Sequence, residues 1–326
     1  MKFDIELLNK GQADCFLVLL ENDRGDECNI LIDGNCQGIK SDSLDKVVER
    51  ISKLKKLDCI VVTHIDNDHI GGVLSLFERD KDVLSCISKQ LKESIIVYNN
   101  VIEGIISYSQ AECFEELIRN KKVINSFNER YENERRMLHF LSIKLRRILE
   151  FNEDTEKNVY VTFLNPDRQG AKKVINDYKK YKDCGKQSDK KLINKNSIVL
   201  LIEFGEKKVL FTGDAYSEDI KMAIDVLKDK SLLSNVNKID WIKIPHHGAY
   251  EYNKSLVSLA KNIDCSNFIL TGKSEWDEKH PSQEILENLL DEFSDVLKIY
   301  TEVDLASIND KFAKTEERFL KEIHIL

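Results

Sequence analysis

The chain has 326 residues, of which 33% are charged and 42% are hydrophobic, and its formal net charge is −8. This composition is typical of a soluble globular protein long enough to bury a sizeable core, and the acidic balance argues against a protein that coats nucleic acid. No apolar run approaches the roughly 20 residues that a membrane span needs, so we predict no membrane contact.

The N-terminus and the cysteines both predict a cytoplasmic protein. The first six residues carry acids where a signal peptide would carry basic and then apolar residues. The eight cysteines are scattered without a Cys-x-x-Cys pair. Several of them fall inside apolar runs, so we expect free buried thiols and a reducing compartment.

The first hundred residues predict strands followed by helices. Residues 2–8 and 15–20 predict a hairpin, and residues 29–32 predict a third strand. A helix is expected over about 43–56, where apolar residues recur at helical spacing. The run 59–62 then predicts a short buried strand that leads into a cluster of His and Asp residues.

Two segments interrupt this pattern. After a strand at 94–99, the residues over about 100–155 are highly charged and lack proline. They predict a helical insertion, which is a candidate surface for a homo-oligomer or a protein partner. The second segment, over about 168–195, is predicted to be a Lys-rich loop.

This Lys-rich stretch reverses the acidic balance of the chain. Within residues 171–195 there are nine Lys and three Asp, with Tyr178 and Tyr181 interleaved. Taken alone, such a stretch is a solvated surface loop. Next to a metal site, Lys and Tyr together can hold a phosphate backbone and stack on bases.

The second half of the chain again alternates strands and helices, and we treat residues 1–326 as one domain. Strands are predicted at 158–164, 197–204, 208–211, 240–244 and 267–271. Helices are predicted at about 217–229, at 253–262 and after Pro281.

Potential metal ligands follow five of the predicted strands. They are Asp33, the motif His64-x-Asp66-x-Asp68-His69, Asp214, the pair His246-His247 and, after a short loop, His280. Ligand sites of α/β proteins lie at the carboxyl ends of strands, so these groups predict a shared site. Imidazole suits Zn²⁺, Mn²⁺ or Fe, and the added carboxylates favour harder ions. The alternative is a polar loop that caps the next helix.

These motifs, in this order, resemble the metallo-β-lactamase superfamily and, within it, the hydrolase domain of ComEC-type DNA-uptake proteins. The resemblance rests on Gly11-Gln12-Ala13-Asp14, Leu31-Ile32-Asp33-Gly34, the His64–Gly72 motif, Asn196-Ser197, Thr212-Gly213-Asp214-Ala215, and Pro245-His246-His247-Gly248 with His280-Pro281. It implies an α/β fold, a four-layer αβ/βα sandwich with two mixed sheets face to face and the site at one edge.

The resemblance also implies two divalent metal ions. His64 and Asp66 would bind one ion, Asp68 and His69 would bind the other, and Asp214 would bridge them. One histidine of the following pair would complete the second site. We favour His247 as that ligand and His246 as a proton donor or substrate contact, but the sequence leaves the choice open.

The chain departs from the widest superfamily pattern at two places. Asp66 stands where most members have His, and Asn196 and Ser197 stand where a His would precede the Asp214 strand. Both changes add oxygen and remove nitrogen at the first site. Mn²⁺ or Mg²⁺ is therefore as credible there as Zn²⁺.

The expected activity is a metal-dependent hydrolase, favoured as a phosphodiesterase or nuclease acting on nucleic acid or a nucleotide. Two cations about 3.5–4 Å apart can share a bridging hydroxide and brace an in-line displacement. Asp68, His246 and His280 are the candidate catalytic residues, the two histidines as acids for the leaving oxygen. The groups expected behind the ligands or against the substrate are Asp33, Asn196, Ser197 and Lys243. The alternative is a hydrolase of small esters, lactones or amides.

Overall fold

A computed structural model describes most of the chain. The described residues are 1–8, 13–35, 41–82, 87–99, 113–114, 116–121, 123–124, 159–184, 189–229, 237–272, 280–305, 308, 319–320 and 323–324.

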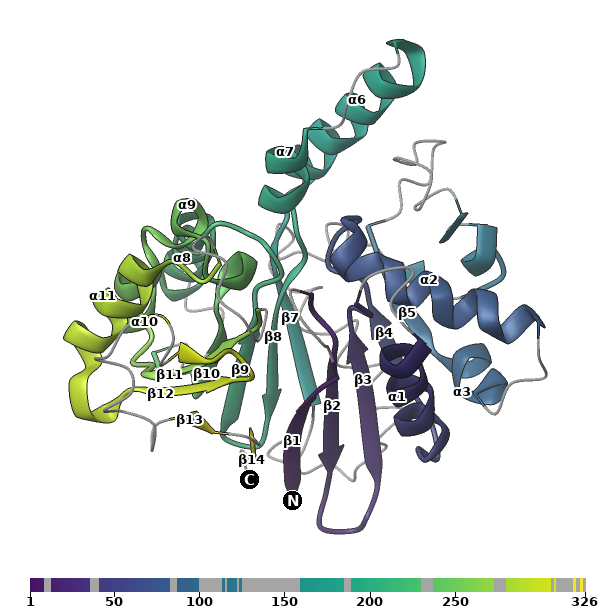
Figure 1. Ribbon diagram of the computed structural model, residues 1–326, viewed down its shortest axis with the longest axis horizontal. Coiled ribbons are helices and arrows are strands. Elements are labelled where there is room, and N and C mark those ends of the chain that lie inside the picture. Colours follow the sequence, from purple (N-terminus) through teal and green to yellow (C-terminus); the bar gives the residue numbers. More distant parts are fainter. Residues whose placement is uncertain are drawn as a thin grey trace.

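Two seven-stranded sheets form the centre of the protein (Figure 1). The first sheet has the order β14 (Ile323–His324), β1 (Lys2–Leu7), β2 (Phe16–Glu21), β3 (Glu27–Ile32), β4 (Cys59–Val61), β5 (Ile95–Val97) and β6 (Val123–Ile124). The second has the order β13 (Phe319–Leu320), β12 (Lys298–Thr301), β11 (Asn267–Leu270), β10 (Trp241–Lys243), β9 (Lys207–Phe211), β8 (Val199–Phe204) and β7 (Val159–Asn165).

The two sheets share a topology. In the first, β1 to β3 are antiparallel neighbours and β3 to β6 are parallel. In the second, β7 to β9 are antiparallel and β9 to β13 are parallel. Parallel neighbours need crossover connections, which helices supply in both halves. Both sheets are therefore mixed, as predicted.

Helices cover the outer face of each sheet (Figure 1). The described helices are α1 (Ser41–Ser52), α2 (Asn67–Asp82), α3 (Ser88–Glu93), α6 (Arg168–Cys184), α7 (Lys190–Lys195), α8 (Ser217–Asp229), α9 (Tyr250–Asn253), α10 (Leu256–Asn262) and α11 (Gln283–Phe293), with 3-10 turns at Pro245–Gly248 and Ser294–Val296. Helices α1 to α3 flank the first sheet, and α8, α10 and α11 flank the second.

The alternation of side chains along the strands builds these layers. In β2, Phe16, Val18 and Leu20 belong to the core between the sheets, whereas Leu17 and Leu19 pack in the core under α1 to α3. Successive residues of a strand point to opposite faces, so a strand that is apolar throughout is buried on both sides. The order helix, sheet, sheet, helix confirms the predicted four-layer αβ/βα sandwich.

The predicted Lys-rich loop is wrong in its secondary structure, because most of it is helical. Residues 168–184 form α6 and residues 190–195 form α7. The stretch 171–184 has no proline or glycine, and Asp189 caps α7 by accepting a hydrogen bond from the backbone N of Leu192 at 3.1 Å. We call these two helices the basic arm. In Figure 1, α6 projects beyond the edge of the sheets and α7 lies at its base.

Most of the predicted helical insertion over about 100–155 lies outside the described residues. Within it the structure describes residues 113–114 and 116–121, which include helical residues, and residues 123–124. The last two form β6, the parallel edge strand beside β5. This described part of the segment therefore belongs to the first sheet.

Two glycines allow α2 to approach β3 closely. A Cβ built on Gly72 would lie 1.5 Å from the carbonyl oxygen of Gly34, and one on Gly34 would lie 2.4 Å from the backbone N of Val73. Only glycine permits such backbone contact. This approach sets the start of α2, and with it the side chain of Asp68, against the end of β3.

Two further sequence expectations bear on the described residues. No helix among them is both long and apolar enough to cross a membrane. Cys15, Cys28, Cys59 and Cys265 are buried free thiols, and Cys113 is an exposed one.

Candidate metal centre

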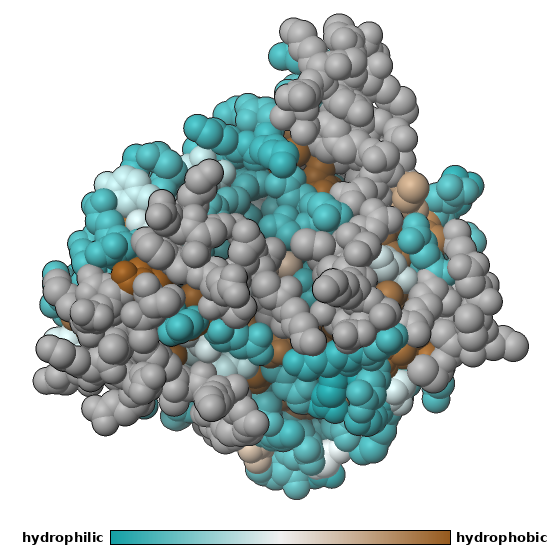
Figure 2. Space-filling view, in the orientation of Figure 1, coloured by the Kyte–Doolittle hydropathy of each residue, from teal (hydrophilic) through white to brown (hydrophobic). Residues whose placement is uncertain are grey.

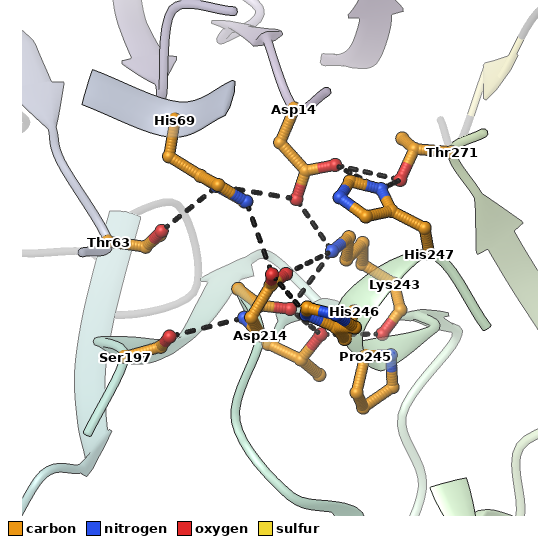
Figure 3. A network of polar contacts seen from close by, with 12 residues as sticks. Asp14, Thr63, His69, Ser197, Asp214, Lys243, Pro245, His246, His247 and Thr271 are labelled. Atoms are coloured by element: carbon orange, nitrogen blue, oxygen red, sulfur yellow. Dashed lines mark hydrogen bonds and ion pairs between the residues drawn. The ribbon is translucent and has the colours of Figure 1, made fainter. Parts of the chain in front are cut away.

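The predicted ligands follow strands of both sheets. Figure 3 shows His69, Asp214, His246 and His247 gathered in one polar network. Thr63 and His64 follow β4, and His69 lies in the first turn of α2. Asp214 follows β9, and His247 lies in the 3-10 turn after β10. The site is therefore assembled from the two halves of the chain.

Four donors converge at the centre of this site. One ligand atom from each of Asp68, His69, Asp214 and His247 lies within 4.8 Å of the others. His247 Nε2 is 3.3 Å from Asp68 Oδ2, and His69 Nε2 is 3.4 Å from Asp214 Oδ2. This is the set predicted for the second ion together with the predicted bridging carboxylate.

His64 and Asp66, predicted for the first ion, lie outside that group of four. His64 Nε2 is 3.7 Å from Asp214 Oδ2, and the His64 and His69 rings are 4.0 Å apart. With its amide oriented to satisfy both ends, Asn194 donates from Nδ2 to Asp66 Oδ2 at 3.3 Å. Asp214 thus lies near ligands predicted for each of the two ions, as expected of the bridging carboxylate.

The donor atoms fit a bound cation. His64 Nε2 and His69 Nε2 are buried and make no hydrogen bond. An unpaired buried polar atom costs about 1–3 kcal/mol, which a bound cation would offset. The donors mix imidazole with carboxylate, a combination that suits Zn²⁺, Mn²⁺ and Fe.

The protonation states of the site follow from its charges. Burial and the neighbouring His69 lower the pKa of His64 to about 3, so its ring is neutral at pH 7 and able to bind a metal. Burial also lowers the pKa of His69, but Asp214, Asp33 and Asp68 outweigh this and raise it well above its ordinary value. Burial together with Asp68 raises the pKa of Asp66 to about 6. The surplus of carboxylates favours a divalent cation.

The ring of His69 is held from behind by Asp33. Its Nδ1 lies 2.7 Å from Asp33 Oδ2, and the backbone N and hydroxyl of Thr63 both donate to Asp33 at 2.7 Å. A carboxylate on the far nitrogen of a metal-binding histidine fixes the tautomer and orientation of its ring. This geometry is the one expected of Asp33.

A second network holds His247. Its Nδ1 is 2.9 Å from Thr271 Oγ1, which donates to Asp14 Oδ1 at 2.7 Å. The other oxygen of Asp14 is 2.6 Å from Lys243 Nζ, which also donates to the Gly213 carbonyl at 2.9 Å. Burial lowers the pKa of Lys243, but Asp14 and Asp214 raise it overall, so the ammonium stays charged.

The structure therefore places Lys243 behind the ligands, and the other position expected for it, against the substrate, is wrong. Its side chain is fully buried and paired with Asp14, because β10 is an inner strand of its sheet. The Asn196 side chain donates to the carbonyl of Leu192 at 2.8 Å and lines a separate cavity of about 370 Å³. Ser197 does reach the site, since its Oγ accepts from the backbone N of Asp214 at 3.2 Å.

The two histidines after β10 face different partners. Nδ1 of His246 is 2.5 Å from Asp214 Oδ2, and its ring stacks on Tyr252 at 4.0 Å and lies 5.3 Å from His280. His246 and His247 both adopt the left-handed backbone region, with φ of 44° and 52°. Such residues cost about 1–3 kcal/mol each, and they persist where surrounding structure enforces them.

Sequence reasoning missed four contributors to the site. Asp14 and Thr271 were visible as a polar residue in the Gly11–Asp14 motif and as the last residue of a predicted strand. Thr63 stands directly before the His64 motif. Asn194 had no such signal, because it comes from the basic arm, outside every motif.

Part of the chain is similar to a known protein family. Residues 8–103 match the model of the metallo-beta-lactamase superfamily. A search of curated proteins found no match.

Among solved structures, three illustrate the similarity. Tm1679, a metal-dependent hydrolase of the beta-lactamase superfamily, is 11% identical with a TM-score of 0.46, over 92% of this chain and 95% of that one. The diiron β-hydroxylase CmlA from Streptomyces venezuelae is 12% identical with a TM-score of 0.44, over 89% and 51%. Human short-form tRNase Z is 12% identical with a TM-score of 0.40, over 83% and 92%.

The matched segment carries the motif from His64 to Gly72 together with Asp14 and Asp33. The finer resemblance to ComEC-type hydrolase domains stays a prediction. Residues 8–103 are thus similar to the metallo-beta-lactamase superfamily, and they lie within an α/β fold of two mixed sheets.

Proposed function

We propose that this protein is a metal-dependent hydrolase of phosphodiesters, with nucleic acid or a nucleotide as its substrate. The observation that carries the hydrolase proposal is the convergence of Asp68, His69, Asp214 and His247 within 4.8 Å. When bound there, divalent ions would supply a nucleophile at neutral pH and stabilise charge on the reacting group.

The residues around the ions have separate tasks. Asp68, Asp214 and His247 would hold the metals, while Asp33 keeps the His69 ring in place. His280 is the candidate proton donor for the leaving oxygen, since its ring lies 5.3 Å from that of His246, which itself contacts Asp214.

The basic arm supports a phosphate-bearing substrate. Its exposed lysines include Lys172, Lys173, Lys180, Lys190, Lys191 and Lys195. Lys190 is near enough to Asp66 to act on its charge. Positive charge thus runs from the projecting helix to the metal ligands, and a phosphate backbone binds to such a track by releasing its counterions.

The surface around this track is polar. In Figure 2 the coloured residues around the base of the arm are mostly hydrophilic, with hydrophobic residues in small patches. In the part of the chain that the structure describes, the exposed large hydrophobics are Met1, Met222, Tyr250 and Val296, which come from separate elements. This favours a polar, charged substrate over an apolar one.

The test is a metal-dependent activity screen. Wild-type protein and Asp68→Ala would be loaded with Mn²⁺, Mg²⁺ or Zn²⁺ and offered single-stranded DNA, duplex DNA, RNA and bis-p-nitrophenyl phosphate, with a lactone and a β-lactam alongside. Glu251→Gln, at an exposed carboxylate, is the matched control. We expect phosphodiester cleavage by the wild type and the control and none by Asp68→Ala. Turnover of the lactone or β-lactam alone would overturn the phosphodiester proposal in favour of the small-ester reading.

A salt series tests the arm. Replacing Lys172 and Lys173 with Gln should weaken binding of single-stranded DNA and lower the slope of log K against log salt by about 0.7 for each lost phosphate contact. The same change at Lys53 and Lys55, exposed lysines that follow α1, should leave the slope unchanged. If both pairs of substitutions lowered the slope equally, DNA binding would depend on the net charge of the protein and not on the basic arm.

A further inference from the structure

We propose that the cavity at the base of the basic arm binds the base of a guanine nucleotide, as a subsite beside the metal centre. Residues of α6, α7 and α8 line this cavity, and its volume is about 370 Å³. Pockets for small ligands are commonly about 300–1,000 Å³. The proposal rests on the proposed function, because it names a nucleotide that a phosphodiester substrate would present there.

One part of the cavity wall is apolar. It is formed by Met222, Ala223 and Val226 of α8 together with Leu192 of α7. Met222 is 53% exposed, so this wall has apolar area that no other part of the described chain covers. The face of a nucleobase is flat and stacks without regard to sequence, whereas its edge carries hydrogen-bonding groups. An apolar wall beside polar side chains therefore suits a base.

The polar side chains of the cavity offer mainly hydrogen-bond acceptors. Asn165 donates from Nδ2 to two backbone carbonyls, each at 2.8 Å, so its amide oxygen is the group left for a ligand. Asn196 also donates from Nδ2 to a backbone carbonyl at 2.8 Å. Asp219 adds a carboxylate, which only accepts hydrogen bonds when it is ionised. A ligand that presents N–H groups would satisfy these oxygens.

Asp219 has one cation beside it, the ammonium of Lys195. Its Oδ2 lies 3.4 Å from Lys195 Nζ, and its side chain is 18% exposed. Burial raises the pKa of Asp219 by more than Lys195 lowers it, so the ionised carboxylate is only partly compensated. Further N–H donors from a ligand would stabilise its charged form. The neighbouring ammonium would at the same time donate to an acceptor on that ligand.

Guanine is the base whose Watson–Crick edge matches this pair of groups. That edge carries two adjacent donors, N1–H and the 2-amino group, followed by the O6 acceptor. Adenine and cytosine offer one donor group there, and uracil and thymine offer a single N–H between two carbonyls. Asp219 would accept from N1 and the 2-amino group, while Lys195 would donate to O6.

The cavity adjoins the loop that carries Asp214. Asn196 in its wall is followed by Ser197, whose Oγ accepts from the backbone N of Asp214 at 3.2 Å. Lys195 Nζ lies 5.7 Å from the centre of the Tyr216 ring, two residues after Asp214. A base in the cavity would thus belong to a nucleotide beside the phosphate at the metal centre. The cavity would therefore influence at which base a strand is cut.

The experiment measures nucleotide binding rather than turnover. GMP, IMP and UMP would be titrated into the wild-type protein by isothermal calorimetry, with Mn²⁺ and again in excess EDTA. IMP differs from GMP only in lacking the 2-amino group. We expect GMP to bind about 5- to 150-fold more tightly than UMP, with IMP between them, and we expect this order in both buffers.

Three variants locate the binding. Asp219→Asn keeps the shape of the side chain but replaces an acceptor oxygen with a donor, so it should abolish the preference for GMP. Met222→Glu places a charge in the apolar wall at an exposed position, and it should weaken the binding of all three nucleotides. Glu218→Gln is the matched control, because it removes an exposed carboxylate on α8 outside the cavity lining. It should bind like the wild type.

Each outcome decides the proposal. Equal affinities of the wild type for GMP, IMP and UMP would overturn the assignment of guanine, and this comparison holds even if Asp219→Asn fails to fold. An unchanged GMP preference in folded Asp219→Asn, or unchanged affinities in Met222→Glu, would place the nucleotide elsewhere. The proposed function fails on a separate observation, the absence of phosphodiester cleavage in the activity screen, so the two failures can be told apart.

Discussion

The buried pair of Lys243 and Asp14 allows a quantitative test of how the site is held together. Both side chains are at most 1% exposed, and Nζ lies 2.6 Å from Oδ2. At an effective dielectric constant of about 20, opposite charges at this distance attract by about 6 kcal/mol, which is offset by the lost hydration of both groups. Lys243→Met keeps the length of the side chain but leaves the Asp14 carboxylate buried without its cation. We expect the free energy of unfolding to fall by about 3–5 kcal/mol.

A double-mutant cycle isolates the pair. Asp14→Asn with Lys243→Met removes both charges, so it should cost less than the sum of the two single changes by about 1.5–3 kcal/mol. Urea unfolding of metal-stripped protein in chelator is the assay, because bound metal would add its own stabilisation. Lys221→Met is the control, because Lys221 and Asp225 form a half-buried i,i+4 pair on α8, and the change should stay within about 0.5 kcal/mol.

Two results would refute this reasoning. A loss below about 1 kcal/mol in Lys243→Met would mean that Asp14 does not depend on the ammonium for its charge. Strict additivity in the cycle would mean that the two groups are energetically independent despite their contact. Either result would remove the argument that Lys243 is a structural cation of the site.

Three further predictions concern the same edge of the sandwich. Gly72→Ala should lower the free energy of unfolding by about 3 kcal/mol or more in urea melts, since its Cβ would meet Gly34 at 1.5 Å; Ser75→Ala on the same helix should change it by less than about 0.5 kcal/mol. Asp33→Asn should weaken metal binding by about 10- to 100-fold in calorimetric titrations, because it disturbs the support of His69, and unchanged affinity would contradict that role. Mn²⁺ or Zn²⁺ at 100 times its dissociation constant should stabilise the stripped protein by about 2.7 kcal/mol, as a rise in melting temperature that EDTA reverses.

Much of the fold could be predicted because local patterns and tertiary structure agree. The strands at 29–32, 59–62 and 197–204 are mostly apolar, as is typical of strands buried on both faces. The polar groups that follow them appear at one edge of the sheets, as expected of strand ends in an α/β protein. Asp33 and the motif from His64 to His69 were found on this basis.

The remaining features depend on tertiary contacts that no local pattern encodes. Lys243 looks like a phosphate-binding residue in sequence, and only the inner position of its strand buries it against Asp14. The basic arm was predicted as a loop because its charge suggested solvent, although charged residues are good helix formers. Asn194 reaches the site only because α7 lies against the turn that carries His246.

The position of the candidate centre also predicts how metal binding would affect the stability of the fold. Asp68 and His69 belong to the half of the chain that builds the first sheet, whereas Asp214 and His247 belong to the half that builds the second. An ion held by all four would link the two halves at the edge where their strands end. Without it, the like charges of Asp68 and Asp214 repel: burial and Asp214 raise the pKa of Asp68, although His69 and His247 outweigh both and lower it overall. Metal binding should therefore stabilise the packing of one sheet against the other, and hydrogen exchange in β4 and β9 should slow together when metal is added.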